Sequence, residues 1–250
     1  WCDSRAAPIG SEIYTEKGTA FFQDRVLQSP GNFTASKLKW VQNNEPELFK
    51  SVAYMMLPGD YIAAKFSGVA QISKSGLSEA ALWNFKKQSL ATEVLEAMEL
   101  PKDVIPEIVD NFGIQAQIDS TLAEELGLSK DVKITYRAGD QPNNALSLNV
   151  TQPGEIATTA GTSAVIYSVT DQDAFDAENR VNTFLHVNNK VMQKRNGVLL
   201  CINGSGILYQ WLRKILSTEQ EQLISYEYLN KLGSQVDAGS DGLLFYPFGN

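Results

Sequence analysis

Two short segments, about twenty residues apart, carry side chains that could transfer a phosphoryl group. Asp140 follows the apolar run Val132–Ala138, so we expect its carboxylate at the end of a strand, where it can accept a proton from a substrate hydroxyl. The second segment is the turn Ala160–Ser163, between two runs that indicate strands. Gly161 lets the backbone approach a phosphate, and consecutive N–H groups with the Thr162 hydroxyl form an anion-binding concavity. Together the segments predict a base and a phosphate-binding turn.

Each of these segments also has a common structural explanation. A Gly-Asp pair such as Gly139-Asp140 often does no more than form a turn. A hairpin needs a glycine at its tip whether or not it binds a ligand, so Gly161 alone does not distinguish the two cases. No lysine follows this glycine, which excludes a Walker-type phosphate loop.

A third segment, Gly204-Ser205-Gly206, opens an amphipathic helix predicted for Gly206–Leu216. Unpaired N–H groups at such a helix start can bind a nucleotide, and Gln210 lies one turn further on the same face as Gly206. The alternative is a simple helix entry with close packing.

His186 is the single histidine of the chain. One histidine cannot supply a metal site built from several histidines. Because the chain has no second histidine, we expect His186 to be a hydrogen-bonded structural residue rather than a catalytic one. The cysteines Cys2 and Cys201 have no metal-ligand spacing, which fits a reducing compartment such as the cytoplasm.

The charge balance restricts the partners. The 250 residues include 21 basic and 29 acidic side chains, a formal net charge of −8, and no basic run occurs. We therefore expect no nucleic-acid and no membrane partner. No apolar stretch approaches the roughly 20 residues of a membrane span.

Periodicity predicts the elements that position these residues, with a change from mainly helical to mainly strand patterns near residue 130. The expected helices are Gly18–Gln28, Thr34–Asn44, Asp60–Phe66, Ser89–Met98, Thr121–Leu126, Gly206–Leu216 and Gln220–Leu232. The expected strands are Val52–Leu57, Val132–Ala138, a hairpin of Ile156–Thr159 with Ala164–Val169, and a hairpin of Val181–Val187 with Lys190–Lys194. A domain boundary is expected near Val150–Pro153.

Three further stretches resemble the FGGY family of carbohydrate kinases, and most closely its xylulokinase branch. Phe33–Val41 (FTASKLKWV) with Asn44–Glu47 is similar to the first family signature, although Asn32 departs from it. Leu57–Tyr61 (LPGDY), followed by Gly68, is similar to a xylulokinase segment. Trp1–Arg5 (WCDSR) resembles a stretch near the sugar site. The resemblance runs in order along essentially the whole chain.

The resemblance implies an α/β actin-like ATPase (ribonuclease H-like) fold of two domains, incomplete at both ends. Residues 1–150 would be the later part of the N-terminal FGGY domain, with the sugar site and the base. Residues 151–250 would be the first part of the C-terminal FGGY domain, on the nucleotide side. The family's N-terminal D-x-G-T turn and its C-terminal glycine-rich signature have no counterpart here, so we expect an internal segment of a longer protein.

The resemblance also implies roles for single residues. On the sugar side, Asp140 matches the catalytic base, Gln141 stands where the family places a sugar-contacting Asn or Gln, and Trp1 falls where related glycerol kinases place a polyol-lining tryptophan. On the nucleotide side, the matching residues are Gly161, Thr162, Gly206 and Gln210. ATP and Mg²⁺ are the implied cofactors.

The expected reaction is transfer of the ATP γ-phosphate to a pentulose hydroxyl, most closely D-xylulose to D-xylulose 5-phosphate. Glycerol, gluconate and ribulose are alternative acceptors. The form Gly139-Asp140-Gln141 is usual in glycerol kinases, whereas xylulokinases commonly carry Asn at the third position. A non-catalytic sugar-binding regulator of the same fold is an alternative of another class, and a homodimer is left open.

Overall fold

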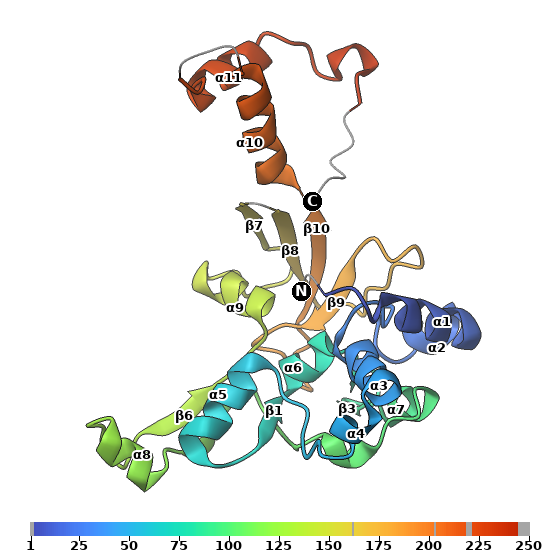
Figure 1. Ribbon diagram of the computed structural model, residues 1–250, viewed down its shortest axis with the longest axis vertical. Coiled ribbons are helices and arrows are strands. Elements are labelled where there is room, and N and C mark those ends of the chain that lie inside the picture. The colour runs from blue at the N-terminus through green and yellow to red at the C-terminus, as the bar shows by residue number, and fades with distance from the viewer. Residues whose placement is uncertain (1–2, 162, 203, 219–221, 245–250) are drawn as a thin grey trace. The chain divides into compact units, whose positions relative to one another are not determined.

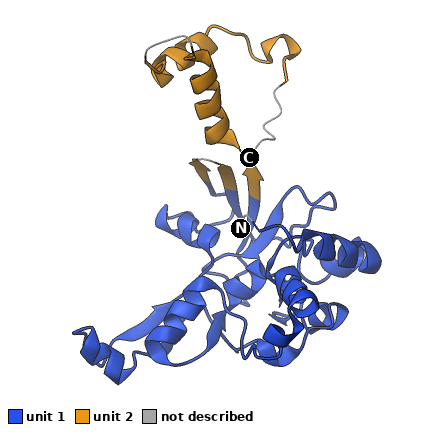
Figure 2. Cartoon of the chain, in the orientation of Figure 1, with its two compact units in different colours: residues 1–157, 167–199 blue, residues 158–166, 200–250 orange. Residues whose placement is uncertain are grey.

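The computed structural model describes residues 3–161, 163–202, 204–218 and 222–244 and is a mixed α/β protein (Figure 1). The chain divides into two compact units (Figure 2). One contains residues 1–157 and 167–199, and the other contains residues 158–166 and 200–250. The α/β composition agrees with the class expected from the sequence.

Among the described residues, five α-helices precede the first strand, and the last four strands follow one another before the last two α-helices. The helices of the described residues are α1 (Ala7–Lys17), α2 (Thr19–Gln23), α3 (Thr34–Asn44), α4 (Pro46–Phe49), α5 (Pro58–Ser67), α6 (Lys74–Glu79), α7 (Thr92–Ala97), α8 (Ser120–Glu125), α9 (Asp140–Ser147), α10 (Ser205–Leu216) and α11 (Tyr226–Gly233), with the 3₁₀ turns η1 (Lys102–Val104) and η2 (Ser240–Gly242). Their ends follow the local chemistry: α5 starts with Pro58 in its first turn and ends at Gly68, whose left-handed φ of 72° favours glycine.

Within the described residues, the strands form one four-stranded sheet and three two-stranded ribbons. The strands are β1 (Gln71–Ser73), β2 (Trp83–Asn84), β3 (Ser89–Leu90), β4 (Glu107–Val109), β5 (Phe112–Gln117), β6 (Lys133–Tyr136), β7 (Ile156–Ala160), β8 (Ala164–Thr170), β9 (Asn182–Leu185) and β10 (Asn196–Ile202). The larger sheet has the order β7-β8-β10-β9. Strand β1 pairs in parallel with β4, and β5 pairs antiparallel with β6.

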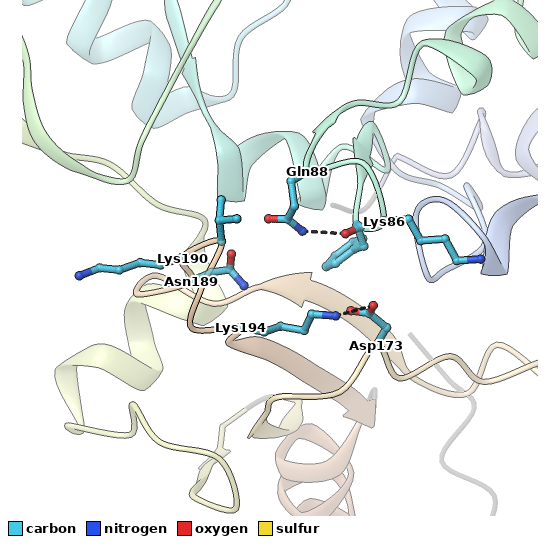
Figure 3. A pocket seen from close by; sticks show the side chains of 8 residues that line it. Lys86, Gln88, Asp173, Asn189, Lys190 and Lys194 are labelled. Atoms are coloured by element: carbon cyan, nitrogen blue, oxygen red, sulfur yellow. Dashed lines mark hydrogen bonds and ion pairs between the residues drawn. The ribbon is translucent and has the colours of Figure 1, made fainter.

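The connection from β9 to β10 differs from the predicted hairpin of Val181–Val187 with Lys190–Lys194. Strand β9 pairs with β10, and Leu185 faces Asn196, so the residues between them form a longer loop with a single bridge from Lys190 to Gln193. This loop borders a cavity of about 420 Å³ (Figure 3). Lys194 pairs with Asp173 at 2.6 Å there. None of the described residues predicted to act on sugar or nucleotide lines this cavity.

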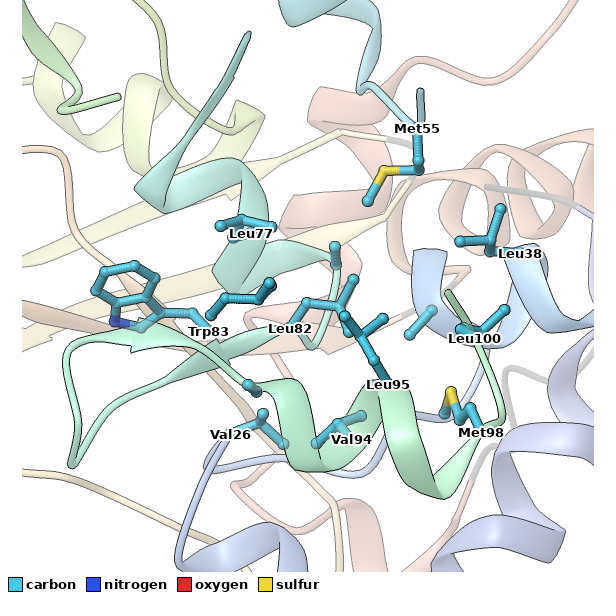
Figure 4. Packing of buried hydrophobic residues seen from close by; sticks show 14 of the residues in the cluster. Val26, Leu38, Met55, Leu77, Leu82, Trp83, Val94, Leu95, Met98 and Leu100 are labelled. Carbon is cyan, nitrogen blue, oxygen red and sulfur yellow. The ribbon is translucent and has the colours of Figure 1, made fainter. Parts of the chain in front are cut away.

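The main hydrophobic core lies in the first unit. It collects side chains from α3, α6 and α7, from the ribbon β2–β3 and from the loops between them (Figure 4). Leu77, Leu82 and Val94 are fully shielded from solvent, and Trp83 is nearly so. Burial of one such aliphatic side chain contributes roughly 1.5–3 kcal/mol, so this cluster holds α6 firmly in place.

A second, smaller core attaches α9 to the sheet. Ala145 of α9 packs with Ala157 of β7 and with Tyr167 and Val169 of β8. Because Asp140 is the first residue of α9, this cluster fixes the direction in which the helix carries it.

Several of the expected elements are confirmed. Helix α3 has the predicted bounds, α10 begins one residue earlier than predicted, and β7 and β8 are neighbours as the predicted hairpin requires. The strand predicted for Val52–Leu57 is wrong, since the segment is irregular. The helix predicted for Ser89–Met98 is shorter, because its first two residues form β3. Part of the helix predicted for Gln220–Leu232 lies outside the described residues, and α11 covers the rest.

In the part of the chain that the structure describes, no helix has both the length and the apolar character that a membrane span requires.

The close contact between α1 and the turn at Gly31 generates a test of this packing. A Cβ on Gly10 would come within 2.0 Å of the Gly31 carbonyl oxygen, which belongs to the backbone and cannot move aside cheaply. We expect Gly10→Ala to lower the free energy of unfolding by about 2 kcal/mol, as overpacking does. Gly59→Ala in α5 is the matched control, because nothing lies within 4 Å of its added methyl group. Denaturant unfolding of both variants measures the difference, and equal stabilities would contradict the contact.

Candidate active site

Asp140 lies at the first position of α9, which corrects the prediction of a strand end. Strand β6 stops at Tyr136, and three residues of extended chain lead to the helix. The Asp140 side chain is exposed, and its Oδ1 accepts a hydrogen bond of 2.7 Å from the backbone N–H of Gln141. A carboxylate in the first turn of a helix is stabilised by the unpaired N–H groups there. The arrangement presents the Asp140 side chain to solvent.

Gly139, the residue before Asp140, lies directly against a second carboxyl group, that of Glu79. A Cβ on Gly139 would fall 1.6 Å from Oε1 of Glu79, the last residue of α6, so a larger residue here would displace the Glu79 carboxyl group. The backbone N–H of Gly139 donates to Oγ of Ser75 at 3.2 Å, which ties the start of α9 to α6. The glycine before Asp140 therefore leaves room for the Glu79 carboxyl group in its present position.

The Glu79 carboxyl has an unusual environment. Its side chain is half-buried as a whole, but Oε1 is closed off from solvent and has no hydrogen-bond partner. Burial raises the pKa of Glu79 to about 8, and the nearby charges of Asp140 and Asp60 add to the rise. At neutral pH this side chain is therefore mainly a neutral acid.

Arg137 anchors the chain three residues before Asp140. Its guanidinium is buried and lies 3.7 Å from Oδ1 of Asp60 in α5. It also donates to the side-chain oxygens of Gln71 at 2.9 Å and Gln115 at 3.0 Å. Burial raises the pKa of Asp60 to about 6, while Arg137 and the Ser73 N–H oppose the rise. The end of β6 is thus fixed to α5, β1 and β5.

His186 is fully buried and its Nδ1 lies 3.0 Å from the hydroxyl of Tyr167. Burial lowers the pKa of His186 to about 4, so the imidazole is neutral near pH 7. This agrees with the structural role expected from the sequence.

The stretches that resemble the family's sugar-side motifs meet in the first unit. Oδ1 and Oδ2 of Asp3 accept hydrogen bonds from the Arg5 guanidinium, which also stacks 4.1 Å over the ring of Trp40. The side-chain N–H of Asn32 donates to the Asp3 carbonyl at 2.7 Å. Trp1, predicted to line the polyol site, lies outside the described residues.

The nucleotide-side residues belong to the second unit, and Thr162 lies outside the described residues. Gly161 follows β7, and its N–H donates to the Ser163 carbonyl at 3.0 Å within the turn. Helix α10 begins after Gly204, whose φ of 82° is left-handed, so Gly206 is in its first turn and Gln210 in the next. Oγ of Ser205 is buried without a partner there. An unsatisfied hydroxyl beside helix N–H groups fits an anionic ligand such as a phosphate.

The structure therefore places Asp140 and Gln141 together in one unit, and Gly161, Gly206 and Gln210 in the other. Sequence reasoning missed Glu79 and Arg137. Neither has a local signal in the sequence, because each is distinguished by a contact with a residue far along the chain, Glu79 with Gly139 and Arg137 with Asp60.

Among the described ranges, no three histidine, cysteine, aspartate or glutamate side chains gather into a metal cluster. A Mg²⁺ ion usually keeps several waters and is held by substrate phosphates with one or two carboxylates, so its use needs no such cluster.

The fold is similar to that of a solved sugar kinase. The crystal structure of xylulose kinase from Rhodospirillum rubrum superposes with a TM-score of 0.86 at 21% identity, covering 98% of this chain and 49% of that one. The fold is therefore the actin-like ATPase fold of carbohydrate kinases, present here in part.

The sequence defines the family. Residues 1–147 match the model of the FGGY family of carbohydrate kinases, N-terminal domain. The chain belongs to the FGGY family of carbohydrate kinases, which are phosphotransferases.

Individual relatives carry different substrate names. Xylulose kinase from Staphylococcus xylosus is 24% identical over 99% of this chain and 50% of its own length. Gluconokinase from Bacillus subtilis is 24% identical over 96% of this chain and 45% of its own length. The chain thus spans about half the length of the curated relatives it matches.

The buried pair of Arg137 and Asp60 predicts a coupled effect on stability. Arg137→Met should lower the free energy of unfolding by about 3 kcal/mol, because it leaves the Asp60 carboxylate buried and unpaired. Adding Asp60→Asn should restore part of the loss. Denaturant unfolding of the two single variants and the double variant measures this coupling, and strictly additive effects would show that the pair does not interact.

Proposed function

We propose that the protein phosphorylates a sugar hydroxyl with ATP, and that its substrate is D-xylulose, converted to D-xylulose 5-phosphate. The proposal is supported by family membership and by the xylulose kinases among the relatives over nearly the whole chain. The single observation that carries the chemistry is the exposed Asp140 carboxylate at the start of α9, held by Gly139 and Arg137.

Asp140 would act as the general base. Its carboxylate accepts the proton of the attacking hydroxyl late in the reaction, once the hydroxyl oxygen has begun to bond to phosphorus, so a carboxylate of low basicity is sufficient. Gln141 would hydrogen-bond the sugar beside it, and Trp1 would line the sugar site. Most of the acceleration would come from positioning and from neutralisation of charge on the transferred group.

ATP is the proposed phosphoryl donor. The turn with Gly161 and Thr162 would contact its phosphates, and Gly206 and Gln210 would contact the nucleotide. The buried Ser205 hydroxyl at the start of α10 supports this, because it needs a polar partner. Mg²⁺ bound to the phosphates would neutralise developing negative charge.

The proposed domains follow one another along the sequence. We propose residues 1–150 as the later part of the N-terminal FGGY domain and residues 151–250 as the first part of the C-terminal domain. A cytoplasmic location is proposed from the cysteine content, and dimer formation is left open.

Gluconate is the second candidate acceptor, favoured by the gluconokinases among the relatives. Gln141 also matches the form usual in glycerol kinases. A non-catalytic regulator is disfavoured, because sugar binding alone does not need the Asp140 base.

The substrate can be tested by coupled ADP release from the full-length protein with xylulose, ribulose, glycerol and gluconate. We expect the highest kcat/KM with D-xylulose. Activity with glycerol or gluconate alone would contradict the proposed substrate. If none of the four sugars stimulates ADP release, the proposed reaction is wrong.

The base can be tested with Asp140→Asn. We expect sugar binding, measured by calorimetry, to persist, and kcat to fall about a hundredfold or more, because the amide cannot accept the proton. Asp131→Asn, an exposed carboxylate in the same segment, is the control and should keep full activity. Full activity of Asp140→Asn would rule out this base.

A further inference from the structure

Glu79 is a polar group that the proposed reaction does not use. It ends a helix whose four preceding residues, Ser75–Ser78, are all buried, and the chain continues into the buried residues Ala80–Trp83. Oε1 of its carboxyl is closed off from solvent and has no hydrogen-bond partner. A buried polar atom without a partner costs free energy, and a catalytic role is one of the reasons for which proteins retain such an atom.

The position of this carboxyl relates it directly to the base. Oε1 occupies the space where a Cβ of Gly139 would stand, so it lies against the backbone that carries Asp140. Ser75, on the same helix, accepts the hydrogen bond of the Gly139 N–H at 3.2 Å. Helix α6 therefore contacts the start of α9 through two side chains, Glu79 and Ser75.

The charged and titratable groups facing Glu79 come from three elements. Asp140 at the start of α9 and Asp60 of α5 are acidic, and both disfavour a further negative charge. Tyr167 of β8 is the third neighbour, and burial with the proximity of Glu79 raises its pKa well above the usual value. Arg137 pairs with Asp60, and His186 contacts Tyr167 in its neutral form. Glu79 has no ion-pair partner of its own within the described ranges.

We propose that Glu79 is a positioning residue for the base, and that it supports Asp140 only as a neutral carboxylic acid. This rests on the proposed kinase reaction. In its neutral form Glu79 packs against Gly139 and leaves the Asp140 carboxylate as the one negative charge presented to the acceptor hydroxyl. When Glu79 ionises, it repels Asp140 and adds a second negative charge at the place that an anionic phosphoryl group must approach.

Because the pKa of Glu79 is about 8, the active form is lost as pH rises through that value. We expect kcat of the wild-type protein to be level near neutral pH and to fall about tenfold by pH 9, one unit above that pKa. The amide of Glu79→Gln imitates the neutral acid. The variant should keep kcat at pH 7 within about threefold and lose the alkaline decline.

Two further variants sharpen the comparison. Glu96→Gln removes an exposed carboxylate of α7 and should keep the wild-type decline. Glu79→Ala removes the support without adding charge, and should lower kcat at every pH while the sugar dissociation constant changes little. An unchanged alkaline decline in active Glu79→Gln would overturn the proposal, as would loss of its activity at pH 7.

Thermal unfolding gives a readout that does not need activity. Folded Glu79 keeps a proton that the unfolded chain loses above the ordinary glutamate value of 4.5, so stability falls as pH rises from there to the folded-state pKa of about 8. Between pH 6.5 and 9 the wild-type Tm should fall about 4 °C further than that of Glu79→Gln. Equal slopes would show that Glu79 is not a buried neutral acid. If this difference is seen but the wild-type protein phosphorylates no sugar, the proposed function fails and the assigned protonation state stands.

Discussion

The buried ion pair of Arg137 and Asp60 is the interaction on which the arrangement of the site depends. One guanidinium reaches α5 through Asp60, β1 through Gln71 and β5 through Gln115, so it fixes three elements to the end of β6 at once. The chain has only two more residues before α9 begins at Asp140. Two residues allow the backbone little conformational freedom, so the position of Arg137 determines where the Asp140 carboxylate lies. An ion pair removed from water is expensive to maintain, and the gain here is geometric definition at one point of the backbone.

The fold was predictable where local chemistry decides the structure. Thr34–Asn44 has helical spacing and was predicted with the correct bounds, because nothing distant competes with it. Val52–Leu57 was mistaken for a strand since its apolar side chains only indicate burial, whereas a strand also needs a partner. The strand predicted for Lys190–Lys194 was wrong for a related reason. Strand β9 pairs further along the chain, with Asn196–Ile202, because the register between strands is decided by tertiary packing.

The site was predictable only in part. Asp140 was identified as a chemical group, although its element was wrong, because Gly139 permits a turn into a helix as readily as a strand end. Glu79 was missed. Its place in the sequence is ordinary for a helix end, and its significance comes from a contact with Gly139, sixty residues away. Contacts of this kind have no local pattern, so the support behind a catalytic residue is harder to predict than the residue itself.

The parallel pairing of β1 with β4 has a consequence for the order in which the protein assembles on the ribosome. Gln71 pairs with Glu107, so the chain between them closes on itself, and nearly all of the main core lies at or before Val104. Chains emerge at about 5–20 residues per second and fold from the N-terminal side. The core around α6 can therefore bury its apolar surface before Arg137 and Asp140 have emerged from the ribosome. Arg137 and Asp140 then pack against a core that has already formed, so misfolding of the core would also misplace these two residues.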